Sequence, residues 1–142
     1  MKFKKYITEL SMSKNTGFEI RRSTSNEFVI DITLKNYDAY YFAADYDSDN
    51  NDWEVEFERE GSGIQRVKID RKVLMELFAA LEKAFSEFLK TKKPDSFYFT
   101  GSKDRIKLYD TIARRITNKT KYKMSKEPTG PGGTAYFFDK EK

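Results

Sequence analysis

The sequence contains neither cysteine nor histidine among its 142 residues, and only three prolines. Without cysteine there are no disulfides and no thiolate metal sites. Without histidine there is no imidazole for a catalytic triad, a zinc site or a proton shuttle. No apolar run approaches the roughly 20 residues of a membrane span, and the first residues lack the apolar segment of a secretory signal. We therefore expect an intracellular protein that is neither secreted nor embedded in a membrane.

The sequence is, by contrast, rich in the aromatic and hydrophobic residues that form a packed core. Twelve phenylalanines, nine tyrosines and one tryptophan make up 15% of the chain, and hydrophobic residues make up 38%. A chain of this length can bury most of the apolar surface of one ordinary domain. We predict a single folded domain over residues 17–142, preceded by an amphipathic segment and linker over residues 1–16.

The formal net charge of +4 conceals an uneven distribution along the chain. Residues 38–60 contain nine acidic side chains and one basic, a regional net charge of −8. Residues 103–126 contain nine basic side chains and two acidic, a regional net charge of +7. Opposed patches of this kind suit electrostatic docking to another macromolecule.

Alternating apolar and polar residues predict a series of strands in the first half of the chain. The expected strands are residues 17–22, 27–35, 40–44, 53–57 and 64–69. Because alternate residues of a strand face opposite sides, the charged alternates indicate an antiparallel meander with one wet face.

The strongest element is a helix over residues 73–89, where apolar residues recur as a broad buried stripe. Asp70 is a suitable N-cap and Pro94 stops the helix. Beyond it we expect strands over residues 97–99, 122–125 and 134–138, a second helix over residues 106–116 and a loop over residues 127–133. The predicted fold is α+β: a twisted, mainly antiparallel sheet, made of a meander and a C-terminal hairpin, with two helices packed on it in the order β-β-β-β-α-β-α-β-β.

An acidic stretch places Asp45, Asp47, Asp49 and Glu56 at positions 1, 3, 5 and 12 of an EF-hand-like calcium loop. The match is degenerate, because Asn50 replaces the glycine that such a loop needs for its sharp turn and strands flank the segment. A solvated hairpin loop is the favoured interpretation, and we expect no metal.

Two charged segments are the expected partner surfaces. The acidic segment with an exposed tyrosine is expected to contact a protein, and the basic segment could contact an acidic protein or nucleic acid phosphates without reading sequence. A protein partner is favoured over nucleic acid. The residues are Tyr46, Asp47 and Asp49 in the acidic segment, and Arg114, Arg115, Lys119, Lys121 and Lys123 in the basic one.

The opening Met-Lys-Phe-Lys-Lys-Tyr-Ile-Thr-Glu resembles the capsid-targeting peptide of internal proteins of large tailed bacteriophages. That peptide begins Met-Lys, carries an aromatic residue followed by Ile, and is cut after an Ile/Leu-x-Glu triplet by the prohead protease. The matching triplet is Ile7, Thr8 and Glu9. The resemblance implies a protein that is packaged with the genome, trimmed to begin at Leu10 and injected into the host.

The order of elements over residues 27–139 is similar to the later part of the GNAT superfamily of N-acetyltransferases. Leu108 and Tyr109 also resemble the segment that supplies a tyrosine general acid in many of these enzymes. By this resemblance Tyr109 would protonate the departing thiolate of coenzyme A. A place in the hydrophobic core is the alternative for Tyr109.

Two departures from that family weigh against activity. Its pyrophosphate loop, a basic residue followed by glycines, would fall in residues 68–73, where no glycine occurs and Asp70 would face the phosphates. Arg71 and Lys72 would be the remaining phosphate contacts, because helix amides alone bind an anion less well. The helical pair expected after the first strand is also missing.

The leading hypothesis is a non-enzymatic phage protein without a cofactor, packaged in the virion or acting early in the host cytoplasm. It would bind a host or viral macromolecule and could serve host takeover or inhibition of a bacterial defence. One alternative is a GNAT-like acyltransferase with an altered cofactor loop. Others are a nucleic-acid-binding accessory protein and a structural component of the virion.

Overall fold

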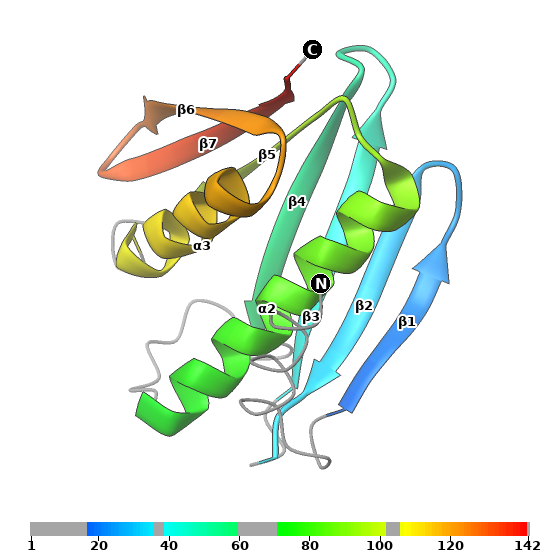
Figure 1. Ribbon diagram of the computed structural model, residues 1–142, viewed down its shortest axis with the longest axis vertical. Helices are drawn as coiled ribbons and strands as arrows, with labels where there is room; N and C mark the ends of the chain where they lie inside the picture. The colour runs from blue at the N-terminus through cyan, green and yellow to red at the C-terminus, as the bar shows by residue number, and fades with distance from the viewer. Residues whose placement is uncertain (1–16, 36–38, 60–70, 102–105, 142) are drawn as a thin grey trace. The chain divides into compact units, whose positions relative to one another are not determined.

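The computed structural model describes residues 17–35, 39–59, 71–101 and 106–141 (Figure 1). Within these ranges the chain forms seven strands and two helices. The elements are β1 (Gly17–Ser23), β2 (Glu27–Thr33), β3 (Ala39–Asp47), β4 (Asp52–Arg59), α2 (Arg71–Lys92), β5 (Ser96–Gly101), α3 (Ile106–Lys119), β6 (Tyr122–Thr129) and β7 (Gly133–Lys140). The predicted strand over residues 64–69 and the cap at Asp70 lie outside the described residues.

The strands form one sheet in the order β1-β2-β3-β4-β5-β7-β6. The β1–β2, β5–β7 and β6–β7 pairs are antiparallel, whereas β4 and β5 are parallel. A parallel pair needs a crossover connection, and α2 lies in the chain between β4 and β5. The predicted α+β class, the mainly antiparallel sheet and the order of elements are confirmed.

The chain divides into two compact units. The first combines Met1–Ala43 with Phe57–Lys92, and the second combines Ala44–Glu56 with Lys93–Lys142. Strands β3 and β4 pass from one unit to the other. The predicted domain boundary at residue 17 is not tested by this division and stays a prediction.

The core of the first unit is aromatic. The ring of Phe42 on β3 lies 4.9 Å from that of Phe85 and 5.9 Å from that of Phe88, both on α2. Phe28 and Phe57 complete the layer, at 6.1 Å from Phe88 and 6.0 Å from Phe85 respectively. The alternation along β2, β3 and β4 thus places its apolar residues against the apolar stripe of α2.

Helix α2 is longer at both ends than the predicted residues 73–89. Lys90 and Lys92 occupy its last turn, where positive charge interacts favourably with the helix dipole. Lys93 then adopts a left-handed conformation (φ 45°), and Pro94 cannot continue a helix. The end of the helix is therefore set by local sequence, as predicted.

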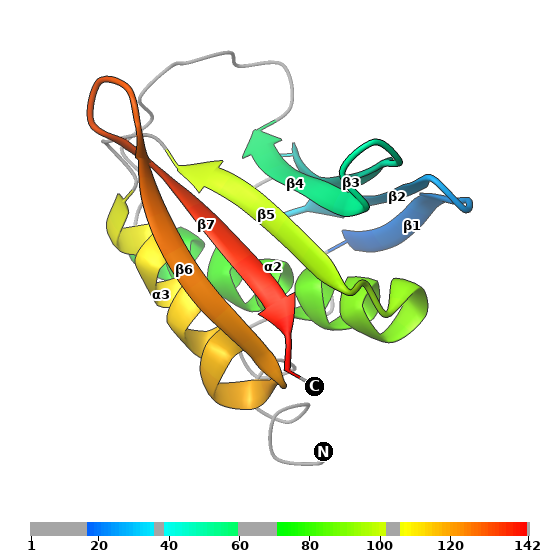
Figure 2. The same cartoon turned by 90° about the horizontal axis from the view of Figure 1, so that it is seen from above.

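The second unit contains β5, β7 and β6 side by side, with α3 packed against them (Figure 2). Phe97 stacks on Phe138 at 4.6 Å, with an angle of 8° between the rings. Phe99 stacks on Tyr136 at 5.1 Å. These contacts follow from the register, because Phe97 lies opposite Phe138 and Phe99 opposite Tyr136 in the β5–β7 ladder.

The predicted seven-residue loop over residues 127–133 is wrong in length. Strand β6 continues to Thr129 and β7 begins at Gly133, so the turn is much shorter. Gly130 (φ 32°) and Gly132 (φ 79°) supply the left-handed conformations that this turn requires, and the Gly133 amide donates to the Gly130 carbonyl at 3.0 Å. The glycines therefore close a hairpin.

Tyr122 at the start of β6 donates its hydroxyl to the carbonyl of Pro94, in the segment that leads into β5. The side chain is only 8% exposed, and burial, followed by the charge of Asp95, raises its pKa from 10.0 to about 12. A tyrosine is neutral when protonated, so this raised pKa contributes stability that is present below pH 10 and is lost as the pH rises towards 12.

We expect Tyr122→Phe to lower the free energy of unfolding by about 1 kcal/mol at pH 7, because the Pro94 carbonyl loses its donor. The variant should also lose less stability than the wild type between pH 10 and 12. Urea unfolding at pH 7, 10 and 12 measures both effects. An identical alkaline loss in the two proteins would assign that loss to other groups, such as Tyr98, whose pKa is also raised to about 12.

In the part of the chain that the structure describes, neither helix is apolar enough over a sufficient length to cross a lipid bilayer.

Candidate functional site

Tyr109 lies on α3 in the core of the second unit and is 7% exposed. Its ring centroid is 5.9 Å from that of Phe99 on β5 and 6.4 Å from that of Tyr136 on β7. It also lies directly against the backbone of Gly101, the last residue of β5. The ring therefore occupies a fixed position beside the C-terminal half of β5.

The residue after Tyr109 anchors the helix to the sheet. The Tyr136 hydroxyl donates to Asp110 Oδ1 at 2.7 Å, and Lys126 Nζ on β6 lies 3.2 Å from the same oxygen. The hydrogen bond from Tyr136, followed by the contact with Lys126, lowers the pKa of Asp110 and outweighs its partial desolvation. Two strands thus hold α3 at the turn that carries Tyr109.

The parallel ladder between β4 and β5 is short. It pairs Trp53 with Phe97 and Glu54 with Tyr98 and ends there, although β4 continues to Arg59 and β5 to Gly101. On its other side β5 pairs with β7 along all six of its residues. Among the residues that the structure describes, β5 beyond Tyr98 pairs with β7 alone, and Tyr109 packs against this part of the strand.

Four polar side chains pair across the β4–β5 ladder. The Tyr98 hydroxyl donates to Glu54 Oε2 at 3.1 Å, and Ser96 Oγ donates to Asp52 Oδ1 at 2.9 Å. Partial burial, then the bond to Glu54, raises the pKa of Tyr98 to about 12. Burial also raises the pKa of Asp52, against the lowering effect of Ser96.

Sequence reasoning missed these pairs. The alternation at residues 52–58 identified the wet face of β4, but it contained no signal for the strand that lies beside it. Residues 44 positions apart meet only because β4 and β5 adopt this register.

The calcium-loop candidates are distributed over two strands and a turn. Asp45 and Asp47 belong to β3 and Glu56 to β4, and only Asp49 lies in the turn between them. Asp47 accepts hydrogen bonds from the Asp49 amide at 3.0 Å and from Asn50 Nδ2 at 2.7 Å, so its carboxylate stabilises the turn. Among the residues that the structure describes, acidic side chains do not gather in threes as a metal site would require.

Tyr46 is only partly exposed, in contrast to its expected exposure. Its ring lies 5.3 Å from that of Trp53, and its hydroxyl donates to Asn51 Oδ1 at 2.9 Å. Asn51 has a left-handed backbone (φ 51°), and this bond helps to hold it in the turn. Tyr46 therefore has a structural role in the hairpin, and its role in binding a partner stays a prediction.

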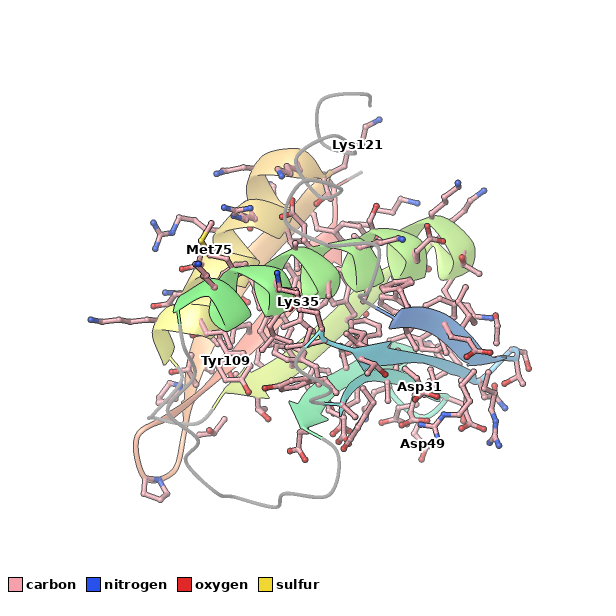
Figure 3. All side chains as sticks on the ribbon, turned by 90° about the horizontal axis from the view of Figure 1, so that it is seen from below. Asp31, Lys35, Asp49, Met75, Tyr109 and Lys121 are labelled. Atoms are coloured by element: carbon pink, nitrogen blue, oxygen red, sulfur yellow. The ribbon has the colours of Figure 1, made fainter. Side chains whose placement is uncertain are left out.

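The predicted basic surface is divided. Arg114, Arg115 and Lys119 are exposed on α3. Lys123 points to the opposite face of the sheet, because it follows Tyr122, whose ring contacts Phe97 on the face that α3 covers. Lys121 precedes β6 and is exposed (Figure 3). The structure thus does not bring these five residues together as one patch, and a nucleic-acid partner stays a prediction.

For the remaining predicted site residues the structure gives little or no information about function. Ile7, Thr8 and Glu9 lie outside the described residues. Arg71 begins α2, and Lys72 is exposed on the first turn of that helix. Both belong to the first unit, whereas Tyr109 and β5 belong to the second, so their role as phosphate contacts also stays a prediction.

No protein-family model matches the sequence, and no curated protein matches it. Solved structures do. An inferred acetyltransferase from Sphaerobacter thermophilus has a TM-score of 0.49 and 8% identity, covering 97% of this chain and 87% of its own. A chimera of the spermidine N-acetyltransferase SpeG from Vibrio cholerae with hSSAT has a TM-score of 0.46 and 7% identity. The match covers 81% of this chain and 66% of the chimera.

RimL, a ribosomal L7/L12 alpha-N-protein acetyltransferase in complex with coenzyme A, has a TM-score of 0.43 and 13% identity, covering 80% of this chain and 60% of its own. The chain thus spans less than two thirds of the length of the SpeG and RimL structures. At these identities the likeness is one of fold.

The comparison corrects the leading hypothesis. The prediction of a non-enzymatic phage protein that binds a host or viral macromolecule is wrong, because the matching solved structures described above are all acetyltransferases. Their fold agrees with the predicted GNAT-like order of elements, which the structure confirms.

Proposed function

We propose that this chain is a GNAT-like acyltransferase that transfers an acyl group from a coenzyme A thioester to an amine. One observation carries the proposal: the parallel β4–β5 ladder ends after Glu54 and Tyr98, and Tyr109 packs on the part of β5 beyond that end. A parallel ladder that stops after two pairs and a fixed tyrosine beside the strand beyond that stop are together suited to a thioester ligand.

The end of the ladder suits the arm of coenzyme A for a chemical reason. The main chain of a strand without a ladder partner can pair with an extended ligand that carries amide groups. The arm of coenzyme A is a chain of two amides that ends in the thiol. Val55 on β4 and Phe99 on β5 directly follow the last paired residues, so such pairing would begin at or beyond these positions.

Acetyl-coenzyme A, when bound, would supply an acyl group activated as a thioester. Tyr109 would hold a proton on its phenolic oxygen for the departing sulfur, since a tyrosine hydroxyl is a donor at neutral pH. The aromatic neighbours Phe99 and Tyr136 would keep water away from this hydroxyl and fix the ring. The phosphates have a poorer site, because residues 68–73 contain no glycine and include Asp70.

Calorimetric titration with acetyl-coenzyme A and with S-acetylpantetheine tests the proposal. Because the nucleotide end has the weaker site, we expect both compounds to bind, with dissociation constants within about tenfold of each other. Thiol release should then be measured with spermidine, an aminoglycoside and a peptide amine as acceptors. Absence of saturable binding by either thioester would overturn the proposal.

Lys72→Ala and Lys121→Ala are a matched pair for the same titration. Both lysines are exposed, but only Lys72 stands at the start of α2. If it contacts a phosphate, its removal should weaken acetyl-coenzyme A and leave S-acetylpantetheine unchanged, and Lys121→Ala should alter neither. Capsid targeting and cleavage after Glu9 are separate from this chemistry and stay a prediction.

A further inference from the structure

Gly101 ends β5 and lies opposite Thr134 in the β5–β7 ladder. The turn glycines Gly130 and Gly132 have positive φ values, whereas Gly101 does not, so a side chain at this position would be compatible with its backbone conformation. Conformational freedom therefore does not explain the glycine. The reason must lie in the space around its Cα.

That space is filled by Tyr109. A Cβ atom placed on Gly101 would lie 2.2 Å from Cδ2, 2.8 Å from Cγ and 2.9 Å from Cε2 of the Tyr109 ring. All three distances are shorter than real Cβ atoms tolerate, and all three nearest atoms belong to the same ring. The tyrosine thus packs on the bare backbone of the strand, in the volume that any other residue would need.

The other sides of the ring are also confined. Phe99 and Tyr136 lie at 5.9 Å and 6.4 Å from it, and both are almost completely buried. The hydrogen bond from Tyr136 to Asp110 holds the backbone of α3 at the next residue. A side chain on Gly101 could therefore be accommodated only by rotation of the tyrosine ring or by movement of α3 away from β5.

We infer that Gly101 is a positioning residue for the acyl-transfer reaction and acts by fixing the ring of Tyr109 against β5. The inference rests on the proposed function, in which Tyr109 is the general acid. A general acid must lie within hydrogen-bond reach of the atom that it protonates, and a displacement of about 1 Å can cost about 10²-fold in rate. The absence of a side chain at the end of β5 sets that position.

Gly101→Ala is the direct test, with acetyl-coenzyme A and spermidine as the assay pair, or whichever of the three amines the wild type accepts best. We expect kcat to fall by about tenfold to 10²-fold and KM for acetyl-coenzyme A to change by less than about threefold. In a Tyr109→Phe background the same substitution should cause no further loss, because the acid is already absent. Equal losses in both backgrounds would overturn the inference and indicate a general structural effect.

Gly17→Ala is the matched control. Gly17 also lies in a strand without a positive φ, and a Cβ there would meet Thr33 Cβ at 3.3 Å, a contact that a small shift relieves. It belongs to the first unit, so we expect its kcat to equal that of the wild type. A loss of kcat in Gly17→Ala comparable to that in Gly101→Ala would overturn the specific role of Gly101.

A measurement that does not depend on enzymatic activity tests this inference separately from the proposed function. Tyrosine labelled with ¹³C at Cζ gives one resonance per ring, and Tyr109→Phe identifies the resonance of Tyr109. Gly101→Ala should shift that resonance, and Gly17→Ala should leave it unchanged. An unchanged Tyr109 resonance in Gly101→Ala would overturn the inference, whereas an inactive wild type with the expected shift would overturn the proposed function and leave the packing established.

If Gly101→Ala alone does not fold, the double variant Gly101→Ala, Tyr109→Leu provides the decision. A leucine side chain lacks the ring atoms that conflict with the new Cβ, so we expect the double variant to regain a cooperative unfolding transition. If Tyr109→Leu does not restore folding, the methyl group introduced at position 101 conflicts with something other than Tyr109. That result would overturn the inference.

Discussion

Tyr109→Phe should lower kcat for acyl transfer by about 10²-fold to 10³-fold, the range for removal of a positioned general acid. The phenyl ring keeps the contacts with Phe99, Tyr136 and Gly101, so the fold and the binding of acetyl-coenzyme A should be retained. Initial rates of thiol release at saturating acetyl-coenzyme A measure the effect, and calorimetry verifies that the dissociation constant is unchanged.

The pH profile strengthens this test. General acid catalysis by a tyrosine predicts an alkaline limb in kcat that the phenylalanine variant lacks. Tyr122→Phe is the matched control, because it removes a buried hydroxyl of the same unit that bonds to Pro94 and leaves Tyr109 and its neighbours unchanged. Equal rates in wild type and Tyr109→Phe would assign Tyr109 to the core alone, the other role that the sequence allowed.

Phe42→Ala is expected to lower the free energy of unfolding by about 3–5 kcal/mol, as large-to-small substitutions of buried aromatic residues do. Phe42 is completely buried and contacts two rings of α2, Phe85 and Phe88. Removal of its ring leaves a cavity between helix and strand, and both aromatic contacts are lost. Since domains are stable by only about 5–15 kcal/mol, the variant should be close to unfolding at 37 °C.

Urea unfolding followed by circular dichroism measures this loss, with Met75→Ala as the control. Met75 lies on the same helix but is 58% exposed, so its truncation should change stability by less than about 0.5 kcal/mol. The slope of unfolding free energy against urea should be similar in wild type and both variants. A loss below about 1 kcal/mol in Phe42→Ala would contradict the packing of α2 on β3.

The order of elements was predictable because its signals are local. Period-two alternation identified β1 to β4, and the broad apolar stripe identified α2 with its stop at Pro94. The errors lay at the ends of elements. Residues 127–129 contain a proline and were assigned to a loop, yet they pair with β7 as the end of an edge strand, where a missing amide hydrogen costs little.

The candidate site was only partly predictable. Tyr109 was identified from a resemblance in the Leu-Tyr segment, but Gly101 carried no local signal that distinguished it from a turn glycine. The division of the basic residues was equally unpredictable. Lys123 and Arg114 are close in sequence, yet Lys123 projects from the face of β6 that α3 does not cover, whereas Arg114 is exposed on α3 itself. Their separation depends on which face of the sheet Tyr122 occupies.

The sequence by itself determined the α+β class, the succession of strands and helices and the absence of histidine and thiol chemistry. These properties depend on residue identity and on spacing within a few turns or strand repeats. Only the tertiary structure decided that the β4–β5 ladder stops after two pairs, that Tyr98 meets Glu54 and that Tyr109 rests on Gly101. Strand register and helix docking are set by contacts between distant segments, and no local pattern encodes which two residues such contacts will bring together.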